Sequence, residues 1–195
     1  MDKILKRSFY AKITVTVAKN LLGKFLVRKI GGRKLIGKIV EVEAYRGFDD
    51  PASHAYHGKT SRNWLMFGKP GYAYIYFIYG NHYCLNITTE KEGFPGAVLI
   101  RALEPVKGID LMKKFRKTSN LKNLTNGPGK LTQALKITKK LNGLDLTKED
   151  GLYVCSGQKK ENFEVVSTYR VGIKVGLDKL WRFYIKNNRF VSTTS

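Results

Sequence analysis

Apolar and polar side chains alternate along residues 39–45, and this alternation predicts a β-strand that is half-buried. Successive side chains of a strand point to opposite faces, which puts on one face Ile39, Glu41, Glu43 and Tyr45. Glu43 and Tyr45 lie about 6.5–7 Å apart on that face, so both can reach one ligand. Glutamate is unfavourable in a strand interior, so the alternative is an edge strand whose two glutamates are solvated.

The pattern predicts further strands and a few helices along the rest of the chain. The strands are expected at 24–30, 34–45, 97–103, 152–155, 163–166 and 181–185. The first two are joined by a short turn at 31–33. Helices are expected within 9–22, over 108–115, and after a glycine-rich turn at 126–130, with Leu131, Ala134, Leu135 and Thr138 on one face. That turn either caps its helix or holds a phosphate.

Residues 47–63 show neither the alternation of a strand nor the 3.6-residue period of a helix, and they are predicted to form a long polar loop. A loop of this length inside a compact domain is usually functional.

Five of the eleven tyrosines fall between residues 72 and 83. The block is typical of a strand, a tight turn at Gly80-Asn81 and a returning strand. Tyrosine is a good strand former, so packing alone explains those within the strands. Tyr79, at the start of the turn, is the one that packing explains least.

Arg101 is the only charged residue in the apolar strand predicted at 97–103. A buried guanidinium requires a carboxylate or a phosphate as its partner. Glu41, Glu43 and Glu104 are the carboxylates that could supply this charge.

Composition narrows the class of partner. Lysine and arginine outnumber aspartate and glutamate by 36 to 15, which leaves a net charge of +21. This excess favours a polyanionic partner, and nucleic acid fits better than a membrane surface because no basic amphipathic helix is evident. We find no stretch long enough to span a membrane and no signal peptide. Cys84 and Cys155 both lie in apolar contexts and fit two buried thiols better than a disulfide.

Several blocks, taken in order, give the chain a resemblance to the alkyladenine (3-methyladenine) DNA glycosylase family. They are EVEAY (41–45), SH (53–54), MFGKPG (66–71), YIYFIYG (74–80), CLN (84–86), RALEP (101–105), NGPGK (126–130) and RVG (170–172). The resemblance covers about residues 9–192. Asn81 is a local difference, since methionine is common beside the hairpin tyrosine in the family.

The resemblance implies a mixed α/β (α+β) fold in a single compact domain over residues 1–195, with a curved antiparallel β-sheet, a β-hairpin and surrounding helices. It also implies roles for seven residues. Glu43 would be the general base and Arg101 would help to hold the attacking water. The pocket around an extruded base would be lined by Tyr45, His54, Tyr76 and Asn86, with Asn86 discriminating between bases. Tyr79 would intercalate into the duplex.

The resemblance implies hydrolysis of the N-glycosidic bond of alkylated or deaminated purines in double-stranded DNA, which leaves an abasic site. No metal and no other cofactor is expected. The chemistry agrees with the residues, because a carboxylate can activate water and stabilise an oxocarbenium-like transition state. Aromatic faces favour a cationic, alkylated base. We expect a monomer in the bacterial cytoplasm, associated with the nucleoid.

Two other classes of protein remain as alternatives. A metal-dependent nuclease could use as its ligands Glu41, Glu43, Asp49, Asp50 and His54. A ribosomal type of RNA-binding protein would account for the charge and the tyrosines. It gives no reason for two glutamates in a strand beside an aromatic cluster.

Overall fold

The computed structural model describes residues 3–78, 80–157 and 162–192. Eight strands lie within these residues: β1 (Phe25–Ile30), β2 (Arg33–Arg46), β3 (Ala73–Ile78), β4 (His82–Thr89), β5 (Gly96–Lys107), β6 (Leu152–Cys155), β7 (Val165–Thr168) and β8 (Arg182–Ile185). The helices are α1 (Arg7–Tyr10), α2 (Thr14–Leu21), α3 (Ile109–Arg116) and α4 (Pro128–Ala134), with single 3-10 turns η1 (Trp64–Phe67) and η2 (Lys139–Leu141).

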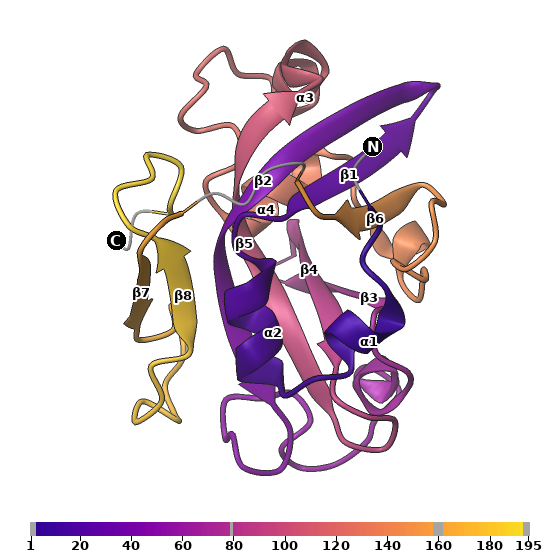
Figure 1. Cartoon of the computed structure of the whole chain (residues 1–195), viewed down its shortest axis with the longest axis vertical. Helices are drawn as coiled ribbons and strands as arrows, with labels where there is room; N and C mark the ends of the chain where they lie inside the picture. The colour runs from indigo at the N-terminus through magenta and orange to yellow at the C-terminus, as the bar shows by residue number, and fades with distance from the viewer. Residues whose placement is uncertain (1–2, 79, 158–161, 193–195) are drawn as a thin grey trace.

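The strands form one antiparallel sheet in the order β3-β4-β5-β2-β1-β6, and the β7–β8 pair joins it at β2. Strand β2 is long enough to pair on one edge with β5 and on the other with β1 and then with β8. The sheet curls around its core, and β7 and β8 lie to one side of β2 (Figure 1). The predicted mixed fold with a curved antiparallel sheet is confirmed.

Most of the predicted elements are confirmed, with differences at their ends. The helix expected within 9–22 is α2, and α1 precedes it. Helix α4 begins at Pro128, inside the predicted turn, and ends at Ala134, so Thr138 lies beyond it. Strand β7 begins at Val165, two residues later than predicted. Residues 47–63 form only turns and bends, as expected of a loop.

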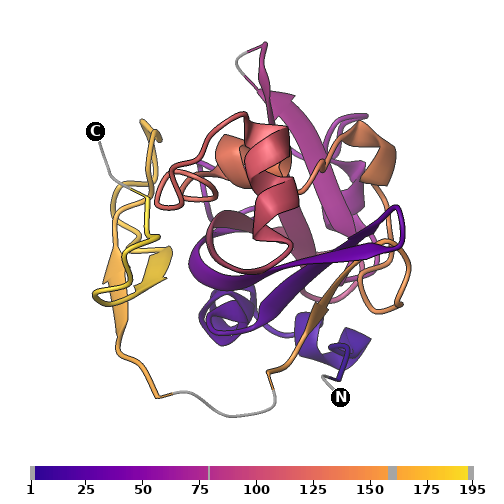
Figure 2. The same cartoon turned by 90° about the horizontal axis from the view of Figure 1, so that it is seen from above.

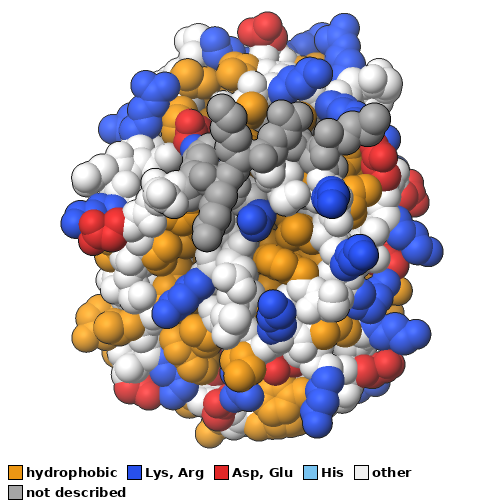
Figure 3. Space-filling model, in the orientation of Figure 1, with side chains coloured by type: hydrophobic (Ala, Val, Ile, Leu, Met, Phe, Trp, Pro, Cys, Tyr) orange, Lys and Arg blue, Asp and Glu red, His pale blue; other side chains and the backbone are white. Residues whose placement is uncertain are grey.

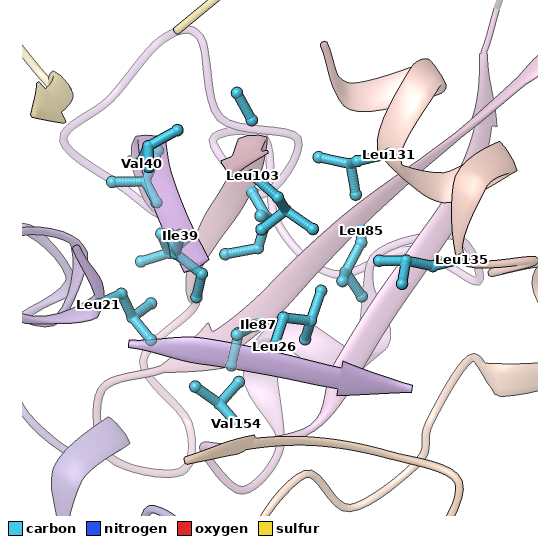
Figure 4. Packing of buried hydrophobic residues seen from close by; sticks show 14 of the residues in the cluster. Leu21, Leu26, Ile39, Val40, Leu85, Ile87, Leu103, Leu131, Leu135 and Val154 are labelled. Atoms are coloured by element: carbon cyan, nitrogen blue, oxygen red, sulfur yellow. The ribbon is translucent and has the colours of Figure 1, made fainter. Parts of the chain in front are cut away.

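A hydrophobic core fills the space between the inner face of the sheet and helices α2 and α4 (Figure 4). Figure 4 shows Leu21 of α2, Leu131 of α4 and Leu135 just after α4 packing toward side chains of several strands. Val42 and Ala44 belong to this core and are fully buried. The next residues along β2 therefore direct Glu41 and Glu43 to the opposite side.

The strict alternation predicted for residues 39–45 fails at its beginning. The register of β2 against β5 shifts between Ile39 and Glu41 and again between Glu41 and Val42, which marks a β-bulge. Ile39 and Val40 consequently both pack in the core, whereas alternation placed Ile39 with the glutamates. The pattern from Glu41 to Tyr45 is unaffected.

The surface is strongly basic. Lys and Arg side chains are spread over the face shown in Figure 3, and Asp and Glu are fewer there. Cys84 and Cys155 are both buried, as predicted. Across the described ranges, no helix is both long and apolar enough to cross a membrane.

Candidate active site

A cavity of about 550 Å³ opens on the side of the sheet opposite the core. Strands β2, β3, β4 and β5 form its wall, and residues 51–54 and 171–175 close it from two loops. Six of the seven residues predicted for the site line it: Glu43, Tyr45, His54, Tyr76, Asn86 and Arg101. Residues that are up to 58 positions apart in the sequence thus meet at one cavity because neighbouring strands present their side chains to the same face.

Glu43 is fully buried and has three partners. The backbone N–H of Val171 donates to Oε1 at 2.7 Å, and the Tyr45 hydroxyl donates to Oε2 at 2.8 Å. Arg101 Nη1 lies 3.3 Å from Oε1. The alternative of a solvated glutamate on an edge strand is therefore wrong at this position, because the strand is paired on both edges and the carboxylate lies at the wall of a cavity.

Arg101 is bound by both glutamates of β2. Its Nε donates to Glu41 Oε1 at 2.9 Å, in addition to the ion pair with Glu43. Glu104, the third carboxylate considered, instead contacts Lys38 and Asn188. The expectation that Arg101 has a carboxylate partner is confirmed, and Arg101 forms ion pairs with two carboxylates.

Tyr45 contributes a hydroxyl donor and an aromatic face. Burial, and then the negative charge of Glu43, raise the pKa of Tyr45 well above its ordinary value, so the hydroxyl remains protonated and can donate to Glu43. The guanidinium carbon of Arg170 lies 4.8 Å from the ring centroid. This contact holds the ring from the side of the 169–176 segment.

His54, Tyr74 and Tyr76 form an aromatic cluster in the cavity. The ring centroids of His54 and Tyr76 are 4.7 Å apart in an edge-to-face arrangement, and those of Tyr74 and Tyr76 are 5.4 Å apart. His54 Nδ1 lies 3.1 Å from the Tyr74 hydroxyl. Burial and the nearby Arg62 lower the pKa of His54, which favours its neutral ring, and burial raises the pKa of Tyr74 to about 12. The cluster is therefore uncharged at neutral pH.

Asn86 lies on β4 and is almost fully buried where it reaches the cavity. Its Nδ2 donates to the backbone oxygen of Tyr74, its register partner on β3, at 3.2 Å. Asn86 therefore makes a hydrogen bond within the sheet and also lines the cavity.

Tyr79, the seventh predicted residue, lies outside the described residues. The strands on either side of it, β3 and β4, form the expected hairpin. In Figure 2 the end of this hairpin projects beyond the rest of the molecule. Gly80 has φ of 69°, a left-handed backbone that favours glycine in a tight turn.

A buried ion pair that the sequence did not predict joins the two loops that line the cavity. Arg170 donates to the two carboxylate oxygens of Asp50 at 2.6 and 2.7 Å, and both side chains are fully buried. Arg170 also donates to the backbone oxygen of Ala44 at 3.0 Å. This fork ties the 47–63 loop to β2 and fixes the residue after it, Val171, whose N–H binds Glu43.

The ligands of the nuclease alternative do not form one cluster. Glu41 binds Arg101 and Arg182, whereas Asp50 binds Arg170 and Asp49 binds Arg46. Within the part of the chain that the structure describes, no three His, Cys, Asp or Glu side chains are placed to hold a metal ion. Each of these three acids instead neutralises an arginine.

Four residues around the cavity have contacts that sequence reasoning did not anticipate: Asp50, Tyr74, Arg182 and Ser192. The tyrosine was noted only as a strand residue, and the aspartate only as a metal ligand. A charged residue in the apolar strand at 181–185 was the available signal for Arg182, by the same argument that singled out Arg101. No pattern in the sequence marks Ser192.

The chain is similar to known proteins over nearly its whole length. Residues 8–189 match the methylpurine-DNA glycosylase (MPG) family. A protein of Carboxydothermus hydrogenoformans is 54% identical over 189 residues, covering 97% of this chain and 98% of that one. Proteins of Clostridium acetobutylicum and Alkaliphilus oremlandii are 50% and 48% identical over 200 residues, each covering 96% of this chain and at least 97% of their own. All three carry the provisional name 3-methyladenine DNA glycosylase.

The cavity thus combines a buried carboxylate with several aromatic side chains, on a strongly basic protein. The chain belongs to the methylpurine-DNA glycosylase family, a family of DNA-repair hydrolases that act on the N-glycosidic bond.

Proposed function

We propose that this protein is a monofunctional DNA glycosylase that flips alkylated or deaminated purines, of the 3-methyladenine and hypoxanthine type, out of duplex DNA and releases them. The observation that carries the proposal is the position of Glu43. It is a fully buried carboxylate at the wall of a cavity of about 550 Å³, and the rings of Tyr45, His54 and Tyr76 line the same cavity. Ligand cavities of roughly 300–1,000 Å³ take small organic molecules, so a purine base fits this volume.

In the proposed reaction Glu43 accepts a proton from a water molecule that attacks C1′ of the extruded nucleotide. A new C1′–O bond forms, the C1′–N bond breaks, and the base leaves with the bonding electrons. The products are the free base and an abasic site. Glu43 also stabilises the positive charge that develops on the sugar, and Arg101, 3.3 Å from its Oε1, helps to hold the water.

Base selection follows from the faces that the cavity offers. The rings of Tyr45, Tyr76 and His54 supply aromatic surfaces that stack on a purine, and a cationic alkylated purine gains further from their electron-rich faces. Such a base is already a good leaving group because its positive charge is neutralised on departure. A strong general acid is therefore not required for it.

The rest of the molecule supplies the DNA contacts. The charge of +21 favours a polyanion, and Lys and Arg are spread over the surface (Figure 3). A target base inside a duplex must be extruded before its glycosidic bond can be reached. Tyr79, which the sequence places between β3 and β4, would fill the gap that the base leaves. We expect a monomer acting on the bacterial nucleoid.

The test is base release from duplex oligonucleotides that carry 3-methyladenine, 7-methylguanine, hypoxanthine or ethenoadenine, with alkaline cleavage of the abasic product. We expect release that persists in excess EDTA and leaves no covalent DNA adduct with borohydride, because no lysine nucleophile takes part. Release that requires a divalent metal would favour the nuclease alternative.

Glu43→Gln tests the mechanism. It preserves size and hydrogen bonding but removes the base, so the single-turnover rate should fall by at least about 10²–10⁴-fold while lesion binding is retained. Glu104→Gln is the matched control, because Glu104 lies on β5 and pairs with Lys38 away from the cavity. Full activity of Glu43→Gln would refute the mechanism.

A further inference from the structure

Glu41 lies two residues before Glu43 and is fully buried in a network of its own. Its Oε1 accepts hydrogen bonds from Arg101 Nε at 2.9 Å and Arg182 Nε at 2.8 Å. Ser192 donates its hydroxyl to Oε1 at 2.8 Å and its backbone N–H to Oε2 at 2.6 Å. Four donors on one buried carboxylate leave it no capacity to act on a substrate.

The network bears directly on Glu43 through Arg101. The guanidinium uses Nε for Glu41, and its Nη1 reaches Glu43 only at 3.3 Å. Arginine prefers a forked contact in which two N–H groups bind the two oxygens of one carboxylate. Arg101 does not make that contact with Glu43, although the two charges are adjacent.

We propose that Glu41, held by Ser192, is a positioning residue that keeps Arg101 turned away from a forked contact with Glu43. Without it, the guanidinium would rotate onto Glu43 and occupy both oxygens. Tyr45 and Val171, the present donors to Glu43, would be displaced, and the carboxylate would lose the free direction in which it meets the water. This inference rests on the proposed role of Glu43 as the base.

Charge and burial support this assignment. Two glutamates face two arginines, Arg101 and Arg182, of which 7% and 6% of the surface is exposed. Arg182 is the register partner of Glu43 on β8, yet its Nε binds Glu41. Glu41 thus binds both Arg101 and Arg182.

Ser192 brings the end of the described chain into the site. Arg182 Nη2 donates to its backbone oxygen at 3.3 Å, and Phe190 anchors the segment in the core with 3% exposure. A serine hydroxyl and a backbone N–H are therefore held in place more than 140 residues away in sequence from the carboxylate that they bind.

The experiment separates chemistry from binding. In Glu41→Gln, the single-turnover rate at saturating enzyme should fall roughly 10- to 100-fold, the loss that a small misplacement of a reacting group causes. The Kd for lesion DNA should stay within about twofold, because Glu41 is fully buried and does not line the cavity. Ser192→Ala should lower the same rate several-fold and serves if Glu41→Gln does not fold. Glu104→Gln is the control and should keep both values.

A double-mutant cycle distinguishes positioning from stability. In an Arg101→Ala background, Glu41→Gln should cause no further loss of rate, because the residue through which it acts is absent. Additive losses, or an unchanged rate together with a lower Tm, would overturn the inference. Glu43→Gln is measured alongside: if it is inactive while Glu41→Gln keeps full rate, only this inference fails, and if Glu43→Gln is active, the proposed function fails.

Discussion

The two glutamates of β2 are the same residue type on the same side of one strand, yet their surroundings differ completely. Glu41 is enclosed by β5, β8 and the 190–192 segment, and four donors satisfy it. Glu43 has donors on one side and a cavity on the other. Both are fully buried. Burial alone therefore does not mark a reactive carboxylate, and the open direction distinguishes the two.

The largest expected difference between Glu41 and Glu43 is in their contribution to stability. Glu41→Ala leaves two buried arginines without their shared carboxylate, so we expect a loss of about 3–5 kcal/mol in the free energy of unfolding. Glu43→Ala should cost less, because Arg101 keeps Glu41 as its partner and water can enter from the cavity. Urea unfolding of both variants measures the difference. Equal losses would remove the distinction between a closed and an open carboxylate.

Asp50→Ala tests whether the Asp50–Arg170 pair stabilises the fold as the enclosed carboxylate of Glu41 does. It strands a fully buried guanidinium, so we expect a loss of about 3 kcal/mol and slower base release as Val171 shifts from Glu43. The matched control is Asp49→Ala, which removes an exposed pair with Arg46 and should cost about 0–1 kcal/mol. Thermal melting and single-turnover assays measure both effects. Similar costs for the two aspartates would contradict the prediction.

Tyr79→Ala should affect DNA and not the fold. We expect lesion binding to weaken by about 1–3 kcal/mol, the value of stacking one base on an aromatic side chain, with Tm nearly unchanged. A core tyrosine would instead cost about 3–5 kcal/mol of stability, by analogy with other large aromatic residues. Melting beside a binding titration separates the two, and a large drop in Tm would make this tyrosine structural.

Asn86→Ser tests base selection in the cavity beside Glu43. The amide at the cavity should crowd the exocyclic 2-amino group of guanine, and relief of overpacking of this kind is worth about 1–3 kcal/mol. Release of normal guanine should therefore rise relative to hypoxanthine. If the ratio does not change, Asn86 acts only through its hydrogen bond to the Tyr74 backbone.

The smallest effect concerns pH. Burial and Arg62 lower the pKa of His54 in the folded protein. Below the pKa of about 6.5 that histidine has in the unfolded chain, the unfolded chain therefore binds a proton more readily than the folded protein does. Stability should fall as the pH drops from 7.5 to 5.5, by at most about 1 kcal/mol, because His54 is an exposed residue and solvent screens its charge. His54→Gln should remove this part of the pH dependence. Identical unfolding curves for His54→Gln and wild type at both pH values would contradict it.

Much of the fold could be predicted because it depends on local patterns. Period and turn residues predicted the β1–β2 and β3–β4 hairpins and the strand that holds Arg101. They also predicted that Glu43 and Tyr45 share a face, and Tyr45 does reach Glu43. The β-bulge between Ile39 and Val42 was not predictable, since a shift of register arises from pairing with β5 and leaves no local signal.

The sequence by itself determined which chemical groups are present, which of them share a face of a strand, and which family the chain resembles. Alternation alone cannot tell Glu41 from Glu43, because both occupy equivalent positions on one strand. Only the tertiary structure decided that Arg182 and Ser192 enclose the first and that the cavity meets the second. The physical reason is that a carboxylate's role depends on the donors around it, and these come from β5, β8 and residues 171 and 192, far away along the chain.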